Sequence, residues 1–142
     1  MKRKATAEWR GDLKTGRGML TTESGVLHDA RYSFTTRFEG EKGTNPEELV
    51  AAAHAGCFAM ALSAELGKAS LTAESLRVTA TVSLEKDAGG WSITESNLEL
   101  VARVPGATAE AFRTAADSAK ANCPLSKLLK AKITLDARLE SP

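Results

Sequence analysis

The stretch Glu39–Leu66, EGEKGTNPEELVAAAHAGCFAMALSAEL, decides the fold of this chain. It begins as a loop punctuated by glycines, and Asn45 and Pro46 then mark a helix start, because asparagine caps helices and proline suits their first position. Small apolar residues follow on nearly every side, whereas a surface helix keeps one polar face. The stretch therefore predicts a buried helix from Asn45 to its end, with His54 and Cys57 near the middle.

Alternating polar and apolar residues predict three strands before this helix. In the third strand, Arg37 is expected to face away from the aromatic side chains. The glycine-rich segment between the first two strands lacks the lysine and hydroxyl residue of a phosphate-binding loop, so we interpret it as a hairpin connection. The three expected strands are Lys4–Trp9, Arg17–Glu23 and Tyr32–Phe38.

After the helix, which Gly67 is expected to end, the pattern predicts a β-hairpin, two helices and a last strand. A change of parity in the returning strand predicts a β-bulge near Glu95–Asn97. The order is βββ-α-ββ-αα-β, an α+β fold forming a single domain over residues 1–142. The expected elements are the strand Leu76–Leu84, the strand Trp91–Val104, a helix from Thr108 to about Ala121, a helix Pro124–Lys130 and the strand Ile133–Leu139.

The composition is that of a soluble globular protein, with 142 residues, 42% hydrophobic and 26% charged residues, and a net charge of +1. No basic stripe with aromatic residues appears, which argues against a nucleic-acid partner. The apolar run Leu49–Ala64 is short and alanine-rich for a membrane span, and the first twenty residues lack the apolar core of a secretory signal. We therefore expect a cytoplasmic protein whose cysteines, Cys57 and Cys123, are kept reduced.

The residues alone leave the role of Cys57 open between packing and chemistry. Free cysteine is often simply buried, and burial raises the pKa of a thiol. A reactive Cys57 would need a nearby cation, for which Arg37 is the best candidate in the sequence. Glu47 or Glu48 could orient that arginine through a bidentate ion pair, although both carboxylates also suit the start of a helix.

Cys123 directly precedes Pro124, at the start of the short helix, where orphan N–H groups favour a thiolate. The alternative is a small, partly buried residue at a helix junction. His54 lies three residues before Cys57 on the same helical face, which is compatible with a nucleophile and its base, with metal ligands, or with a core histidine. No further ligand motif completes a zinc set, so we expect no metal.

Four segments of the chain closely resemble the OsmC/Ohr family of cysteine-based organic hydroperoxide peroxidases, whose namesake is the osmotically inducible protein C. The resemblance extends from Trp9 to Leu139 without a large gap. The segments are TESGVL (22–27), FTTRFEGEKGTNPEEL (34–49), AAHAGCFAMALS (52–63) and NCPLSKLLKAKITLD (122–136).

The resemblance implies a role for each candidate residue. Cys57 corresponds to the peroxidatic cysteine and Cys123 to the resolving cysteine, while Arg37 corresponds to the activating arginine and Glu47, rather than Glu48, to its carboxylate partner. It further implies an intertwined homodimer, in which a long buried helix bears the cysteine and the active sites form where two subunits meet.

The implied activity is reduction of organic hydroperoxides, and of hydrogen peroxide less well, to alcohols, without a cofactor. Cys57 would form a sulfenic acid and then a disulfide with Cys123, which a small dithiol or a lipoyl-type protein would reduce. Two competing hypotheses are a hydrolase or acyl transferase using Cys57 with His54, and a non-catalytic dimeric binding module.

Overall fold

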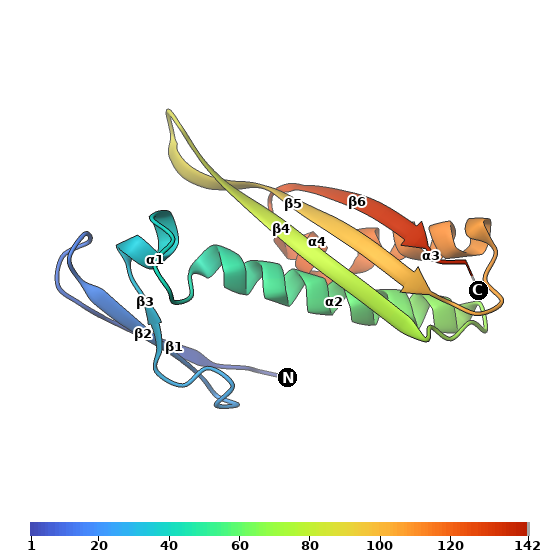
Figure 1. Cartoon of the computed structure of the whole chain (residues 1–142), viewed down its shortest axis with the longest axis horizontal. Coiled ribbons are helices and arrows are strands. Elements are labelled where there is room, and N and C mark those ends of the chain that lie inside the picture. Colours follow the sequence, from blue (N-terminus) through green and yellow to red (C-terminus); the bar gives the residue numbers. More distant parts are fainter. Residues whose placement is uncertain (142) are drawn as a thin grey trace. The chain divides into compact units, whose positions relative to one another are not determined.

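The computed structural model describes residues 1–141, which form ten helices and strands (Figure 1). The chain divides into two compact units, Met1–Leu49 and a second unit from Val50 onward. The single domain over residues 1–142 stays a prediction. The first unit begins with the strands β1 (Ala5–Arg10), β2 (Arg17–Thr22) and β3 (Ala30–Tyr32).

These three strands form one antiparallel sheet in the order β1-β2-β3. Gly18 of β2 lies opposite both Trp9 and Tyr32. A Cβ atom on Gly18 would come within 2.3 Å of the Tyr32 ring, so only glycine allows this ring to lie across the sheet. The hairpin that joins β1 to β2 turns at Gly11, whose φ of +93° favours glycine. The expected hairpin connection is therefore confirmed.

The third predicted strand, Tyr32–Phe38, is wrong for most of its length, because the chain forms a short helix, α1 (Phe34–Phe38), after β3. Ser33 caps this helix by accepting from the backbone N–H of Thr36 at 3.1 Å, and the Thr36 hydroxyl in return accepts from the backbone N–H of Ser33. A capping box of this kind favours the helix over continued strand pairing. Arg37 lies on this helix, so the prediction that it faces away from the aromatic side chains of a strand is also wrong.

The long helix α2 (Pro46–Lys68) confirms the element that the opening stretch predicts. The Asn45 side chain accepts from the backbone N–H of Glu48 at 2.8 Å, as expected of a capping residue. The helix passes through Gly67 and ends one residue later, which corrects the predicted end.

α2 buries one stripe of side chains at every fourth position, formed by His54, Phe58, Leu62 and Leu66. Other apolar positions on this helix are not buried, and Met60 is 77% exposed. The expectation of a helix buried on all sides is therefore not met within one chain. By length and apolar composition α2 could cross a membrane, as the core helices of many soluble proteins could. The apolar residues of its buried stripe belong to the protein core.

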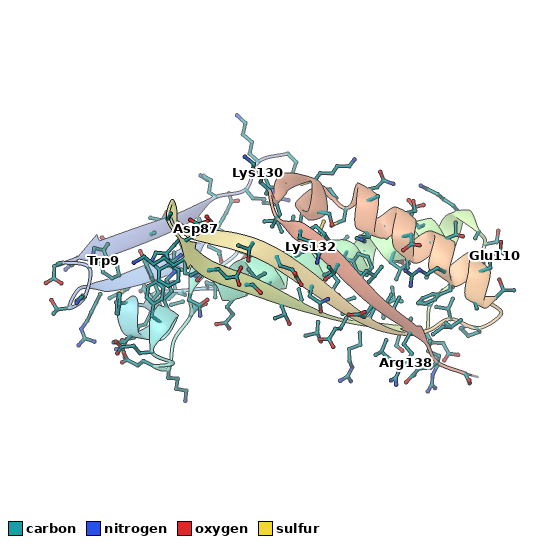
Figure 2. The ribbon with its side chains drawn as sticks, turned by 90° about the horizontal axis from the view of Figure 1, so that it is seen from above. Trp9, Asp87, Glu110, Lys130, Lys132 and Arg138 are labelled. Atoms are coloured by element: carbon teal, nitrogen blue, oxygen red, sulfur yellow. The ribbon has the colours of Figure 1, made fainter. Side chains whose placement is uncertain are left out.

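The second unit holds a sheet in the order β4-β5-β6, with β4 (Ser75–Asp87) antiparallel to β5 (Gly90–Arg103). β6 (Lys132–Leu139) pairs in parallel with β5, and Figure 2 labels Lys132 at its start and Arg138 near its end. The register shift lies between Ser83 and Leu84, whose partners are Glu95 and Ile93. The extra residue is thus Thr94, one position before the predicted bulge.

Two helices connect β5 to β6, α3 (Ala109–Asn122) and α4 (Pro124–Leu128), in agreement with the predicted order. Thr108 caps α3 by accepting from the backbone N–H of Ala111 at 3.1 Å. α2, α3 and alternate residues of β5 bury a common core, so an α+β fold is confirmed. Its larger fully buried members are Phe58, Leu62, Leu66, Leu98, Leu100 and Cys123.

Candidate active site

The two cysteines, 66 positions apart in the sequence, meet in the second unit. Cys57 lies on α2, and Cys123 lies at the junction where α3 ends and α4 begins. The Cys123 thiol donates to the sulfur of Cys57, with an Sγ–Sγ distance of 3.0 Å, and both cysteines are free thiols. Because a disulfide has an S–S length of about 2.05 Å, the two sulfurs need approach by only about 1 Å to form one.

The two thiols differ in accessibility. Cys57 is partly exposed, whereas Cys123 is fully buried. Burial raises the pKa of the Cys57 thiol above its ordinary value, while a hydrogen bond with the backbone at Leu125 acts in the opposite direction. The second unit on its own therefore favours the thiol form of Cys57, and a thiolate there would require a further positive group.

Arg37 and Glu47 form a bidentate ion pair in the first unit. The Nε and Nη2 atoms of Arg37 donate to the two carboxylate oxygens of Glu47, at 3.1 and 2.6 Å. The side chains are 35% and 13% exposed, so this pair is better shielded from water than an ordinary surface pair. The Arg37 guanidinium also lies 5.3 Å from the centre of the Phe38 ring. The two hydrogen bonds to Glu47 identify this residue, and not Glu48, as the carboxylate that orients Arg37.

Arg37 also lines a hollow of about 340 Å³ within the first unit. Most of the other lining side chains are aromatic or apolar, so the guanidinium offers a cation beside a surface that would accept an apolar group. These side chains include Trp9, Leu13, Tyr32, Phe34 and Phe38.

His54 is fully buried, and both of its ring nitrogens are paired with serine hydroxyls. Nδ1 lies 2.7 Å from the Ser96 hydroxyl on β5, and Nε2 lies 2.8 Å from the Ser126 hydroxyl on α4. Burial lowers the pKa of the imidazole, so the neutral ring is favoured. With both nitrogens engaged, His54 is placed as a core histidine and not as the base for Cys57 that a hydrolase would need.

Sequence reasoning did not single out Ser96 and Ser126. A signal existed for Ser96, because it occupies a position of β5 in phase with Leu98 and Leu100, where an apolar side chain would be expected. No sequence pattern marked Ser126. Within residues 1–141, no three His, Cys, Asp or Glu side chains gather as a set able to hold a metal ion.

Comparison with known proteins finds a matching family model and similar sequences along most of the chain. The family model of OsmC-like proteins matches residues 39–138. The chain is 54% identical over 139 residues to peroxiredoxin OsmC of Escherichia coli strain K12, covering 98% of this chain and 97% of that protein. It is 32% identical over 125 residues to the organic hydroperoxide resistance protein OhrB of Bacillus subtilis, covering 87% and 88% of the two chains.

Solved structures share the fold. The crystal structure of Bacillus subtilis OhrB matches with a TM-score of 0.68 at 28% identity, covering 96% of this chain and 98% of that one. An OsmC-like protein of unknown function from Vibrio cholerae matches with a TM-score of 0.78 over 97% and 99% of the chains. At 16% identity, this second match is informative about the fold alone.

Proposed function

The chain belongs to the OsmC-like family of proteins, and from this premise we propose that it is a thiol-dependent peroxidase that reduces organic hydroperoxides to alcohols. The names of its relatives, a peroxiredoxin and an organic hydroperoxide resistance protein, support an oxidoreductase of this kind. The single observation that carries the proposal is the pair of free thiols, Cys57 and Cys123, with their sulfurs 3.0 Å apart.

In the first step, the thiolate of Cys57 attacks the distal oxygen of the hydroperoxide. The S–O bond forms as the O–O bond breaks, and the leaving alkoxide takes up a proton and departs as the alcohol. Cys57, now a sulfenic acid, has been oxidised by two electrons. The choice of Cys57 as the attacking sulfur is supported by its partial exposure, since Cys123 is fully buried.

In this proposal Arg37 supplies the cation that Cys57 needs. Burial raises the pKa of the Cys57 thiol, so catalysis at neutral pH requires a group that favours the thiolate. A guanidinium with two of its donors held by Glu47 has a fixed orientation and further N–H groups for a thiolate and for the peroxide oxygens.

In the second step, Cys123 attacks the Cys57 sulfenic acid to form a disulfide, and the oxygen leaves as water. A dithiol reductant, either a small dithiol or a lipoyl-type protein, then regenerates both thiols by thiol–disulfide exchange. Because Cys123 is the buried sulfur, we expect the reductant to attack Cys57 and to release Cys123 first.

The hollow beside Arg37 supports a preference for organic hydroperoxides over hydrogen peroxide. Its aromatic lining would bury an alkyl or aryl group, which hydrogen peroxide lacks. The runner-up function, a hydrolase using Cys57 and His54, is disfavoured because both nitrogens of His54 are already hydrogen bonded.

We also propose a homodimer, in which a second copy covers the apolar surface of α2 around Met60. We do not assign which subunit contributes Arg37 and Glu47 to each active site. A cytoplasmic location is proposed, in which the closely spaced thiols of Cys57 and Cys123 would be kept reduced between turnovers.

The test is turnover of cumene hydroperoxide with dithiothreitol by wild type, Cys57→Ser and Cys123→Ser. We expect Cys57→Ser to lose activity and Cys123→Ser to form a sulfenic acid that recycles poorly with a disulfide-specific reductant. Full activity in Cys57→Ser would refute the peroxidase function. Hydrolytic activity that survives the loss of Cys123 but falls in His54→Ala would favour the hydrolase.

A further inference from the structure

A largely buried set of polar side chains, which we call the His54 clasp, joins three elements of the second unit. It consists of His54 on α2, Ser96 on β5 and Ser126 on α4. His54 and Ser96 are both fully buried. An apolar side chain could fill this space without the cost of burying an imidazole and a hydroxyl, so the clasp calls for an explanation beyond packing.

The position of the clasp relative to the two sulfurs suggests that explanation. His54 precedes Cys57 by three residues on α2, and Ser126 follows Cys123 by three residues. The bond from His54 Nε2 to the Ser126 hydroxyl, 2.8 Å long, therefore joins the two segments that carry the cysteines, close to both. The two sulfurs lie 3.0 Å apart beside it.

α4 depends on such a contact to keep its place. It has five residues, and Cys123, at its N-cap, makes no capping hydrogen bond through its side chain. A helix of this length is not stable by itself, so its position is set by tertiary contacts. Ser126 provides one of these contacts and the partly buried Leu125, which packs against the core, provides another.

We propose that the bond between His54 and Ser126 is a positioning device that keeps the sulfur of Cys123 within reach of the oxidised Cys57. The proposal rests on the peroxidase function above and assigns His54 and Ser126 a role in its second step only. They are positioning residues, which act through the placement of α4 and do not touch the peroxide.

The step that the clasp would assist is the condensation of the sulfenic acid with the second thiol. The Cys123 sulfur attacks the Cys57 sulfur, the S–S bond forms and the S–O bond breaks. The departing hydroxyl combines with the proton of Cys123 and leaves as water, while Cys123 is oxidised and the Cys57 sulfenic acid is reduced to the disulfide level. If α4 shifts, the sulfenic acid lasts longer, and a second peroxide can oxidise it to the sulfinic acid.

The experiment is a single turnover of the reduced full chain with one equivalent of cumene hydroperoxide. Dimedone trapping measures the sulfenic acid, and mass spectrometry of quenched samples measures the disulfide. In Ser126→Ala we expect disulfide formation to slow by about tenfold, because a small displacement of a reacting group can change rates by this much or more. Sulfenic acid formation should stay within about twofold of wild type.

Two variants serve as controls. Ser96→Ala removes a hydroxyl from the same imidazole but leaves the bond to α4, so its disulfide formation should slow by no more than about threefold. Ser126→Thr keeps the hydroxyl and should restore disulfide formation.

Disulfide formation at the wild-type rate in Ser126→Ala would overturn this inference and leave the proposed function intact. Equal slowing in Ser96→Ala and Ser126→Ala would also overturn it, since His54 would then act only as a stabilising core residue. Failure of the wild type to form either the sulfenic acid or the disulfide would refute the proposed function itself, together with the inference.

Discussion

The ion pair between Arg37 and Glu47 distinguishes two adjacent carboxylates that the sequence leaves nearly equivalent. Both Glu47 and Glu48 lie in the first turn of α2, where either suits the helix dipole. Only the structure gives the two hydrogen bonds to Glu47, because short-range patterns do not encode the direction in which Arg37 points. Short-range patterns likewise do not predict the hydrogen bond of Ser126, because its partner, His54, lies 72 positions away in the sequence.

We predict that Glu47→Gln slows the oxidation of Cys57 by cumene hydroperoxide by about tenfold, since hydrogen bonds to charged groups contribute about 1.5–3 kcal/mol each. The amide cannot hold the guanidinium through two charge-assisted bonds. The measurement is the second-order rate constant of thiol loss. Glu48→Gln is the matched control and should react within about twofold of wild type. Equal rates in all three proteins would remove the ion pair from the mechanism.

The second prediction at this scale concerns pH and the buried His54. Burial lowers its pKa in the folded chain below the ordinary value of 6.5, whereas the unfolded chain titrates at the ordinary value. On acidification the unfolded state therefore binds the proton first, and the free energy of unfolding falls as pH drops below about 6.5 toward the folded pKa.

Urea denaturation of wild type, His54→Gln and His28→Gln at pH 7 and pH 5 measures this contribution. We expect His54→Gln to lose less stability between the two pH values than wild type does. His28, whose side chain is 77% exposed, serves as the control for the loss of a histidine outside the core. An unchanged pH dependence in His54→Gln would contradict the assignment of a buried neutral imidazole.

At the scale of elements, long periodic segments could be predicted and a short one could not. α2, β4, β5, α3 and β6 follow from their hydrophobic periods and caps, apart from small shifts at their ends. The segment around Ser33 was misassigned because Phe34 and Phe38 satisfy both a two-residue and a four-residue period. Their rings lie 4.8 Å apart, as they can one turn apart on a helix, and the Ser33 cap decides between the two periods.

We predict that Ser33→Ala lowers the free energy of unfolding by about 1 kcal/mol, the usual effect of removing a capping hydroxyl. Ser33→Asp keeps an acceptor for the backbone N–H of Thr36 and should remain close to wild type. Both values come from urea denaturation followed by circular dichroism. If Ser33→Ala and Ser33→Asp are equally destabilised, the cap does not determine α1.

At the scale of the whole molecule, a single chain leaves apolar surface on its longest helix. The sequence predicted a helix buried all round, but only one stripe of α2 is buried in the described chain. No sequence pattern distinguishes burial within one chain from burial by another, since both use the same small apolar residues. The proposed homodimer reconciles the composition of α2 with its exposure.

We predict that Met60→Glu weakens dimerisation by roughly 100-fold, because an unpaired charge in an apolar interface is costly. Sedimentation equilibrium of the purified protein gives the dissociation constant. Leu128→Glu is the matched control, because Leu128 is 74% exposed on α4, and this variant should remain dimeric. A Met60→Glu protein that associates as wild type does would exclude this face of α2 as the interface.

The central claim is that Cys57 and Cys123 are the reacting pair of a peroxidase. The most direct measurement is peptide mass spectrometry of the reduced protein after one equivalent of cumene hydroperoxide, with free thiols alkylated on quenching. We predict the loss of both thiols together and a single disulfide-linked peptide containing Cys57 and Cys123, matched by one equivalent of the alcohol. Alkylation of both cysteines at the level of the untreated protein, with the hydroperoxide unconsumed, would contradict it.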